Sequence, residues 1–283
     1  MGVERKRMGV SGQPSRESDA ARAIGVFDSG VGGLTVVRAL MERLPFESIL
    51  YFGDTARVPY GVKSSDTIVH YARQIVEFLL QRRVKMLIVA CNTMSAVALD
   101  AIKELSRVPV LDVLHAGARS AAKATRAKYV GIIGTPATIN SNAYARAIHQ
   151  VDPEIRLFSQ ACALFVPLVE EGWLDHPVTR LTAMEYLKVV LSHEVDTLVL
   201  GCTHYPLLKP VLQDVVGSGI TLVDSAEAMA EETADVLSRL ELWNPHRVAP
   251  EYQFCVTDVP LRFQAIGERF LGRALQGVRL VQW

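Results

Sequence analysis

This sequence of 283 residues has few cysteines, no net charge and no long apolar run. Its four cysteines form no C-x-x-C pair, so they provide neither a disulfide framework nor the spacing of a zinc ribbon or a dithiol redox motif. No stretch approaches the roughly 20 apolar residues that span a bilayer. Because 30 basic residues balance 30 acidic ones, the charge also argues against nucleic acid or an anionic membrane as a partner.

The first 22 residues are charged and contain no apolar core segment, so they do not resemble a secretory signal. We expect residues 1–22 to be a flexible extension. Without a signal or a disulfide pattern, the protein is expected to be cytoplasmic with reduced thiols. A hydrophobic fraction of 49% and a charged fraction of 21% are typical of a globular protein with one large domain or two moderate ones.

From residue 23 onward, short apolar runs alternate with segments of helical periodicity, which predicts βαβ units and mainly parallel sheets. The expected strands are 23–27, 48–52, 86–90, 108–112, 129–133, 197–200 and 220–223. The expected helices are 34–43, 66–81, 95–105, 144–150, 179–192 and 226–240. After 240 we expect only a short ordered tail that packs back on the first part of the chain.

The chain also repeats itself coarsely. Leu87 and Cys91 align with Leu198 and Cys202 at a constant offset of 111 residues, and apolar helices precede both strands at the same distance. The repeat predicts two similar α/β domains related by a pseudo-twofold duplication, with an active site in the cleft between them. The expected boundaries are 23–114 together with 225–283 for the first domain and 115–224 for the second.

Two cysteines stand at equivalent points of this repeat. Cys91 and Cys202 each follow a buried strand and precede polar residues. Because ligands of open parallel sheets bind at the carboxyl ends of the strands, facing domains would bring both thiols to one cleft. A lone cysteine is most often a small buried hydrophobe, which is our expectation for Cys162 and Cys255. A matched pair instead favours one site with a proton carrier on either side.

Polar loops follow other strands at the same sheet edges. A glycine-rich turn over 27–34 has Asp28 at its mouth and suits an anion, although it matches neither the P-loop nor G-x-G-x-x-G. The loops 53–61 and 134–138 supply hydroxyls and amides but few cations, which suits a small ligand with carboxylates. His204 lies two residues after Cys202, where an imidazolium would lower the pKa of the thiol.

Five segments together resemble the glutamate racemase family: 27–34 (FDSGVGGL), 58–61 (VPYG), 91–93 (CNT), 164–170 (LFVPLVE) and 200–208 (LGCTHYPLL). They occur in the order of the family and extend over residues 23 to about 240. The resemblance implies cofactor-independent interconversion of L- and D-glutamate, without pyridoxal phosphate or a metal. It further implies that the product D-glutamate supplies peptidoglycan synthesis, and that the protein is a homodimer, as family members often are.

The resemblance also implies roles for individual residues. Cys91 and Cys202 would be the two catalytic bases, with Asp28 assisting the first and Glu170 and His204 assisting the second. The implied substrate contacts are Asp28, Ser29, Tyr60, Gly61, Asn92, Thr93, Thr135, Thr203 and His204. The chain departs from the family at Ala163, where a proline is usual, and this change is expected to loosen the backbone that leads to Glu170.

Racemisation removes a proton from one face of Cα and returns a proton to the other, so two bases on opposite walls avoid moving one base across the ligand. No lysine occupies a comparable strand end, where it could hold pyridoxal phosphate. Two alternatives stay open: an aspartate racemase or related cofactor-free enzyme of the same fold, and a non-catalytic two-lobe amino-acid-binding protein. A thiol-based redox or metal site is disfavoured by the missing C-x-x-C and the single nearby histidine.

Overall fold

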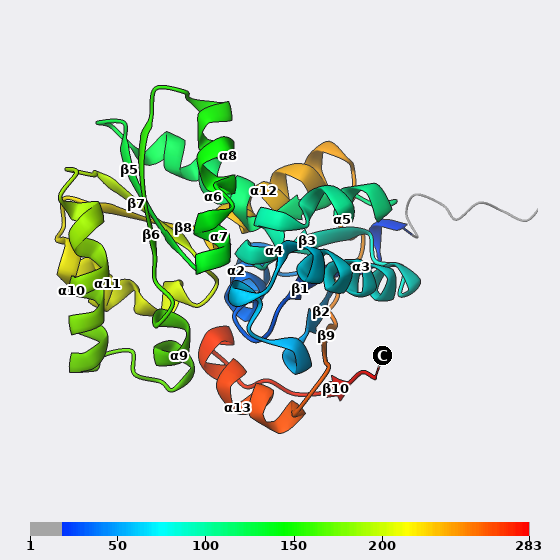
Figure 1. Ribbon diagram of the computed structural model, residues 1–283. Coiled ribbons are helices and arrows are strands. Elements are labelled where there is room, and N and C mark those ends of the chain that lie inside the picture. The colour runs from blue at the N-terminus through cyan, green and yellow to red at the C-terminus, as the bar shows by residue number, and fades with distance from the viewer. Residues whose placement is uncertain (1–18, 283) are drawn as a thin grey trace, which may run out of the picture.

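The computed structural model describes residues 19–282, so most of the expected extension over 1–22 lies outside the described residues. In the described part, two parallel sheets are flanked by helices and lie in the two halves of the molecule (Figure 1). The predicted class, α/β with two mainly parallel sheets, is confirmed. No helix within 19–282 is both long enough and apolar enough to cross a membrane.

The larger sheet has the strand order β10-β9-β2-β1-β3-β4, and all of its neighbouring strands pair in parallel. Its strands are β1 (Ile24–Asp28), β2 (Ile49–Gly53), β3 (Met86–Val89), β4 (Val110–Asp112), β9 (Tyr252–Val256) and β10 (Val278–Leu280). The central strands are buried along their whole length and are rich in β-branched and aromatic residues, as strands covered on both faces require.

The smaller sheet has the order β6-β5-β7-β8 and is also parallel throughout. Its strands are β5 (Tyr129–Gly134), β6 (Arg156–Ala161), β7 (Thr197–Gly201) and β8 (Thr221–Asp224). This order repeats the β2-β1-β3-β4 order of the larger sheet, with β5 in the place of β1 and β7 in the place of β3. Asp112 and Asp224, at the ends of the corresponding strands β4 and β8, both cap the helix that follows.

Helices cover the faces of both sheets (Figure 1). They are α2 (Leu34–Arg43), α3 (Ser65–Gln81), α4 (Asn92–Val97), α5 (Leu99–Leu105), α6 (Val113–Ala124), α7 (Pro136–Asn140), α8 (Ala143–Val151), α9 (Phe165–Glu170), α10 (Pro177–Leu191), α11 (Lys209–Val216), α12 (Ser225–Arg239) and α13 (Pro260–Leu271). Short 3-10 turns are η1 (Thr55–Arg57), η2 (Tyr60–Val62) and η3 (Tyr205–Leu208).

The structure differs from the sequence-based expectation in several places, and the helices α6, α7, α9 and α11 were not expected. The single helix expected over 95–105 is two helices, α4 and α5, because Ala98 leaves helical geometry at φ −120° and ψ 0°. The edge strand β6 was not expected, since its half-exposed residues lack an apolar run. The segment after 240 is more than a short tail: β9 and β10 extend the larger sheet, and α13 packs on α2.

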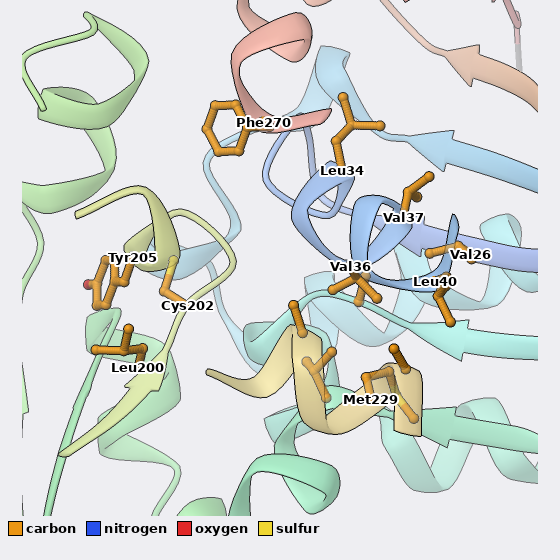
Figure 2. Packing of buried hydrophobic residues seen from close by; sticks show 14 of the residues in the cluster. Val26, Leu34, Val36, Val37, Leu40, Leu200, Cys202, Tyr205, Met229 and Phe270 are labelled. Carbon is orange, nitrogen blue, oxygen red and sulfur yellow. The ribbon is translucent and has the colours of Figure 1, made fainter. Parts of the chain in front are cut away.

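One continuous apolar core joins the two sheets. Figure 2 shows Leu34 and Leu40 of α2, Leu200 at the end of β7, and Met229 of α12 within the same cluster. The helix α12 packs against both α2 and α6. Each fully buried side chain of this size contributes about 1.5–3 kcal/mol to stability. The shared core therefore fixes the position of the carboxyl ends of one set of strands relative to those of the other.

Candidate active site

A cavity of about 410 Å³ lies at the carboxyl ends of the central strands of both sheets. Both strand-end thiols line it, Cys91 after β3 and Cys202 after β7. The expected site residues meet here with one exception, Asp28, which lies behind the wall. The lining is formed by Ser29, Gly30, Val58, Pro59, Tyr60, Gly61, Val62, Cys91, Asn92, Thr93, Thr135, Pro136, Ala163, Val166, Pro167, Glu170, Cys202, Thr203 and His204.

Cys91 is the N-cap residue of α4. Its Sγ accepts a hydrogen bond from the backbone N–H of Met94 at 3.5 Å and lies 3.7 Å from the hydroxyl oxygen of Ser29. The thiol is almost fully buried. Burial, followed by the negative charge of Asp28, raises the pKa of the Cys91 thiol to about 12. Cys91 is therefore a protonated thiol at neutral pH in the ligand-free protein.

Asp28 ends β1 directly behind the cavity wall. Its Oδ2 accepts hydrogen bonds from the backbone N–H groups of Gly30 at 3.1 Å and Gly33 at 3.0 Å. A Cβ at Gly33 would stand 2.6 Å from the Cβ of Asp28, so only glycine allows this turn. The other oxygen, Oδ1, is buried without a hydrogen-bond partner. Asp28 thus shapes the turn and places negative charge near Cys91.

Cys202 has a different neighbour. The Nδ1 of His204 lies 3.9 Å from the Sγ of Cys202, and the Nε2 of the same ring lies 3.1 Å from Oε1 of Glu170. Glu170 reaches the ring from the end of α9, and Ala163, which precedes this helix, also lines the cavity. The three groups form a thiol–imidazole–carboxylate row.

The imidazole of this row is cationic at neutral pH. Burial disfavours the charged ring, but the hydrogen bonds to Cys202 and Glu170 outweigh burial and raise the pKa of His204 to about 10. In turn, the hydrogen bond from His204 holds the pKa of the Glu170 carboxyl below its usual range. A cation next to a thiol favours the thiolate, so the row is suited to hold negative charge on Cys202.

Hydroxyl groups from both sheets meet on the wall between the thiols. The Oγ1 atoms of Thr93 and Thr135 are 3.1 Å apart, and Thr138 lies within 3.3 Å of both. A Cβ at Gly61 would stand 2.9 Å from the Cβ of Thr135, so this glycine permits the close approach of the two strand-end edges. The wall offers hydrogen-bond donors to a small anionic ligand.

Sequence reasoning missed several supporting residues. Asp54 accepts hydrogen bonds from the Tyr60 hydroxyl and from Arg57, and so fixes the ring of Tyr60 at the cavity. The hydroxyl of Tyr144 donates to Oδ1 of Asn92 at 2.6 Å. The polar loop that holds Asp54 was visible in the sequence, whereas Tyr144 carried no signal beyond its place in an amphipathic helix.

The arrangement can place a small dicarboxylate between a buried thiol and a thiol paired with an imidazolium. Such a pair can take a proton from one face of a carbon and deliver one to the other. Within residues 19–282, no group of three or more His, Cys, Asp or Glu side chains is arranged to hold a metal ion.

Comparisons with known proteins agree with this geometry. A model of the Asp/Glu/Hydantoin racemase family matches residues 24–233. Glutamate racemase of Syntrophus aciditrophicus is 71% identical over 268 residues, which are 95% of this chain and 99% of that protein. The crystal structure of glutamate racemase from Francisella tularensis with D-glutamate has a TM-score of 0.88 and 44% identity, covering 93% of this chain and 98% of that one. The crystal structure of glutamate racemase from Thermus thermophilus with β-chloro-D-alanine has a TM-score of 0.85 and 46% identity, covering 93% of this chain and 98% of that one.

Proposed function

This chain belongs to the Asp/Glu/Hydantoin racemase family, and we propose that it interconverts L- and D-glutamate by moving the α-proton between Cys91 and Cys202. The observation that carries the proposal is the presence of both thiols in one cavity, each at the equivalent strand end of a repeated sheet. A non-catalytic binding protein would need the polar walls but gains nothing from matched thiols. The volume of about 410 Å³ lies in the range typical of small-molecule sites.

The two thiols have different charged neighbours, Asp28 beside Cys91 and His204 beside Cys202. The thiolate of Cys202, next to the imidazolium of His204, takes the α-proton of one enantiomer, and the protonated thiol of Cys91 delivers a proton to the opposite face. The other enantiomer needs the reverse protonation of the pair, so substrate binding and proton exchange are coupled. Asp28 assists Cys91 by keeping the strand-end turn in place, and Glu170 assists Cys202 by holding His204 charged.

The α-proton next to a carboxylate is weakly acidic, so the walls must stabilise the charge that develops. The hydroxyls of Ser29, Thr93, Thr135 and Thr203 and the amide of Asn92 line the cavity and would donate to the glutamate carboxylates as negative charge grows. Tyr60 and Gly61 close the same wall. Among the described residues, no lysine lines the cavity, which supports a reaction without pyridoxal phosphate; we also propose that no metal takes part.

We assign residues 23–114 and 225–283 to the first domain and 115–224 to the second; every strand of the larger sheet falls in the first set and every strand of the smaller sheet in the second. By likeness to the family, we propose a cytoplasmic homodimer whose D-glutamate supplies peptidoglycan synthesis. Sedimentation of the purified chain would separate a dimer from a monomer.

A chiral assay without added pyridoxal phosphate tests the reaction. Each enantiomer of glutamate should be converted to an equal mixture of both, and in deuterated water the inverted product should carry deuterium at Cα. L- and D-aspartate, assayed in parallel, should react far more slowly. Faster turnover of aspartate than of glutamate would favour an aspartate racemase. Tight binding of glutamate without inversion would favour a binding protein. Retention of the original hydrogen at Cα would exclude proton exchange through the thiols.

A further inference from the structure

The amide of Asn92 is held by a residue from the opposite half of the molecule. Asn92 begins α4, directly after Cys91, and its side chain is only 3% exposed. Its Oδ1 accepts a hydrogen bond of 2.6 Å from the hydroxyl of Tyr144, which belongs to α8 and is equally buried. The bond therefore crosses from the helix that covers the smaller sheet to the catalytic loop of the larger one.

The other end of the same amide has no partner. Asn92 Nδ2 is buried and makes no hydrogen bond within the described residues, although Asn92 lines the cavity between the two thiols. A buried amide N–H without a partner costs free energy of about 1–3 kcal/mol. Such a cost is recovered when an anionic ligand in the cavity accepts the hydrogen bond, so the free donor points to the place of a substrate carboxylate.

The surroundings of Tyr144 fix its direction as a donor. Burial and the charge of Asp112 raise the pKa of Tyr144 well above its ordinary value, against a smaller opposing effect of the hydrogen bond from Ser225. The phenol therefore stays protonated. Because Oδ1 of Asn92 accepts the proton of Tyr144, Nδ2 of the same amide is turned away from the phenol.

Two glycines leave the space that the ring of Tyr144 occupies. A Cβ at Gly117 would stand 3.2 Å from the hydroxyl oxygen of Tyr144, and a Cβ at Gly201 would stand 3.0 Å from its Cε2 atom. Gly201 is the residue directly before Cys202. The ring thus lies against the strand that presents one thiol while its hydroxyl holds the residue next to the other thiol.

We propose that Tyr144 is a positioning residue for the racemisation: it fixes the amide of Asn92 so that its N–H groups meet a glutamate carboxylate, and it ties this donor to the strand end that presents Cys202. The inference rests on the proposed function, since it assigns glutamate as the ligand of the amide. It differs from a packing role because only the hydroxyl, and not the ring, makes the bond to Asn92.

The test is a double-mutant cycle of Tyr144→Phe and Asn92→Ala, read by kcat/KM and by calorimetric binding of glutamate. Tyr144→Phe keeps the ring and should lower kcat/KM and weaken glutamate binding by about tenfold to a hundredfold, the effect of leaving a buried acceptor without its donor. In the Asn92→Ala background, the same change should alter either quantity by less than about twofold, because the amide it orients is gone. Tyr129→Phe, at the opposite end of β5, is the control and should leave both quantities unchanged.

Two results would overturn the inference: kcat/KM and binding of Tyr144→Phe that match the wild type, or an effect of Tyr144→Phe that adds in full to that of Asn92→Ala. Thermal unfolding does not enter this decision, because a purely structural role would lower the melting temperature without cancelling in the cycle. The wild-type protein tests the proposed function separately. If it binds glutamate without inverting it, the cycle in binding affinity still decides the role of Tyr144; if it neither binds nor inverts glutamate, both proposals are rejected.

Discussion

The two thiols of the candidate active site occupy matching places in the two sheets but have opposite charged neighbours. Cys91 follows β3 and faces the carboxylate of Asp28, and burial together with this charge raises its pKa to about 12. Cys202 follows β7 and faces the imidazole of His204, which Glu170 helps to keep cationic, with a pKa of about 10. The strand order repeats while the charged partners do not, so the duplication has kept the position of the thiols and changed their charged neighbours.

The chemistry constrains where this difference can be seen. Enantiomers have equal free energies in water, so kcat/KM must be equal in the two directions at every pH. The unequal thiols must therefore show themselves in the separate steps: in proton exchange by one thiol alone, in the titration of each thiol, and in the response of each thiol to its charged neighbour.

Removing either thiol should have the largest effect. Cys91→Ala and Cys202→Ala should each lower racemisation by at least about a thousandfold, since each removes one of the two proposed proton carriers. In deuterated water each variant should still exchange the α-hydrogen of only one enantiomer, and the two variants should choose opposite enantiomers, because the remaining thiol faces only one side of Cα.

Nuclear magnetic resonance of the recovered glutamate measures this exchange. Cys255→Ala, which removes a buried cysteine of β9 away from the cavity, is the matched control and should retain activity. Full racemisation by either the Cys91 or the Cys202 variant, or exchange of the same enantiomer by both, would contradict the assignment of one thiol to each side of Cα.

Neutralising the charged neighbour of each thiol should have the next largest effect. The two substitutions remove charges of opposite sign, so they should act in opposite directions on the two thiols. His204→Asn removes a cation next to Cys202, so negative charge on that sulfur is stabilised less, and kcat/KM at neutral pH should fall by about tenfold to a hundredfold, recovering in part as the pH is raised. Asp28→Asn removes an anion next to Cys91, so the pKa of Cys91 should fall. Thiolate absorbance, followed against pH in variants that carry only one of the two thiols, measures each pKa; shifts of the same sign in both would refute the assigned asymmetry.

Much of this site could be predicted because its residues lie at strand ends. The apolar runs before Cys91 and Cys202 fix two buried strands, and parallel sheets place ligands at their carboxyl ends, so the cavity followed from local sequence. Tyr144 could not be predicted, because its apolar neighbours mark a helix and nothing local shows that its hydroxyl crosses to Asn92. The edge strands β6 and β10 were missed because their exposed and half-exposed residues lack the apolar continuity of central strands. The strand β9 was missed because its buried apolar run is only the three residues Phe254–Val256.

Glu170 could be predicted only in part. Its helix α9 was not expected, because Pro167 interrupts the apolar run; the proline is tolerated because it stands in the first turn, where no intrahelical N–H bond is required. Only the resemblance to a family placed Glu170 near Cys202, and the packing of α9 against η3 brings it to His204. A contact between segments more than 30 residues apart depends on tertiary packing, which local patterns do not encode.

The smallest effect should come from Glu170→Gln, which keeps the shape of the row but removes its outer charge. The side chain of Glu170 is 34% exposed, so solvent screens the pair, and we expect kcat/KM to fall by only about threefold to tenfold. The sign follows from the raised pKa of His204: the paired carboxylate stabilises the imidazolium, so in the variant His204 should lose its proton at a pH below 10. Nitrogen-15 resonances of the His204 ring, recorded against pH, measure this shift. An unchanged His204 titration with a large loss of activity would instead place Glu170 in direct contact with the substrate and give the Cys202 wall a second acid.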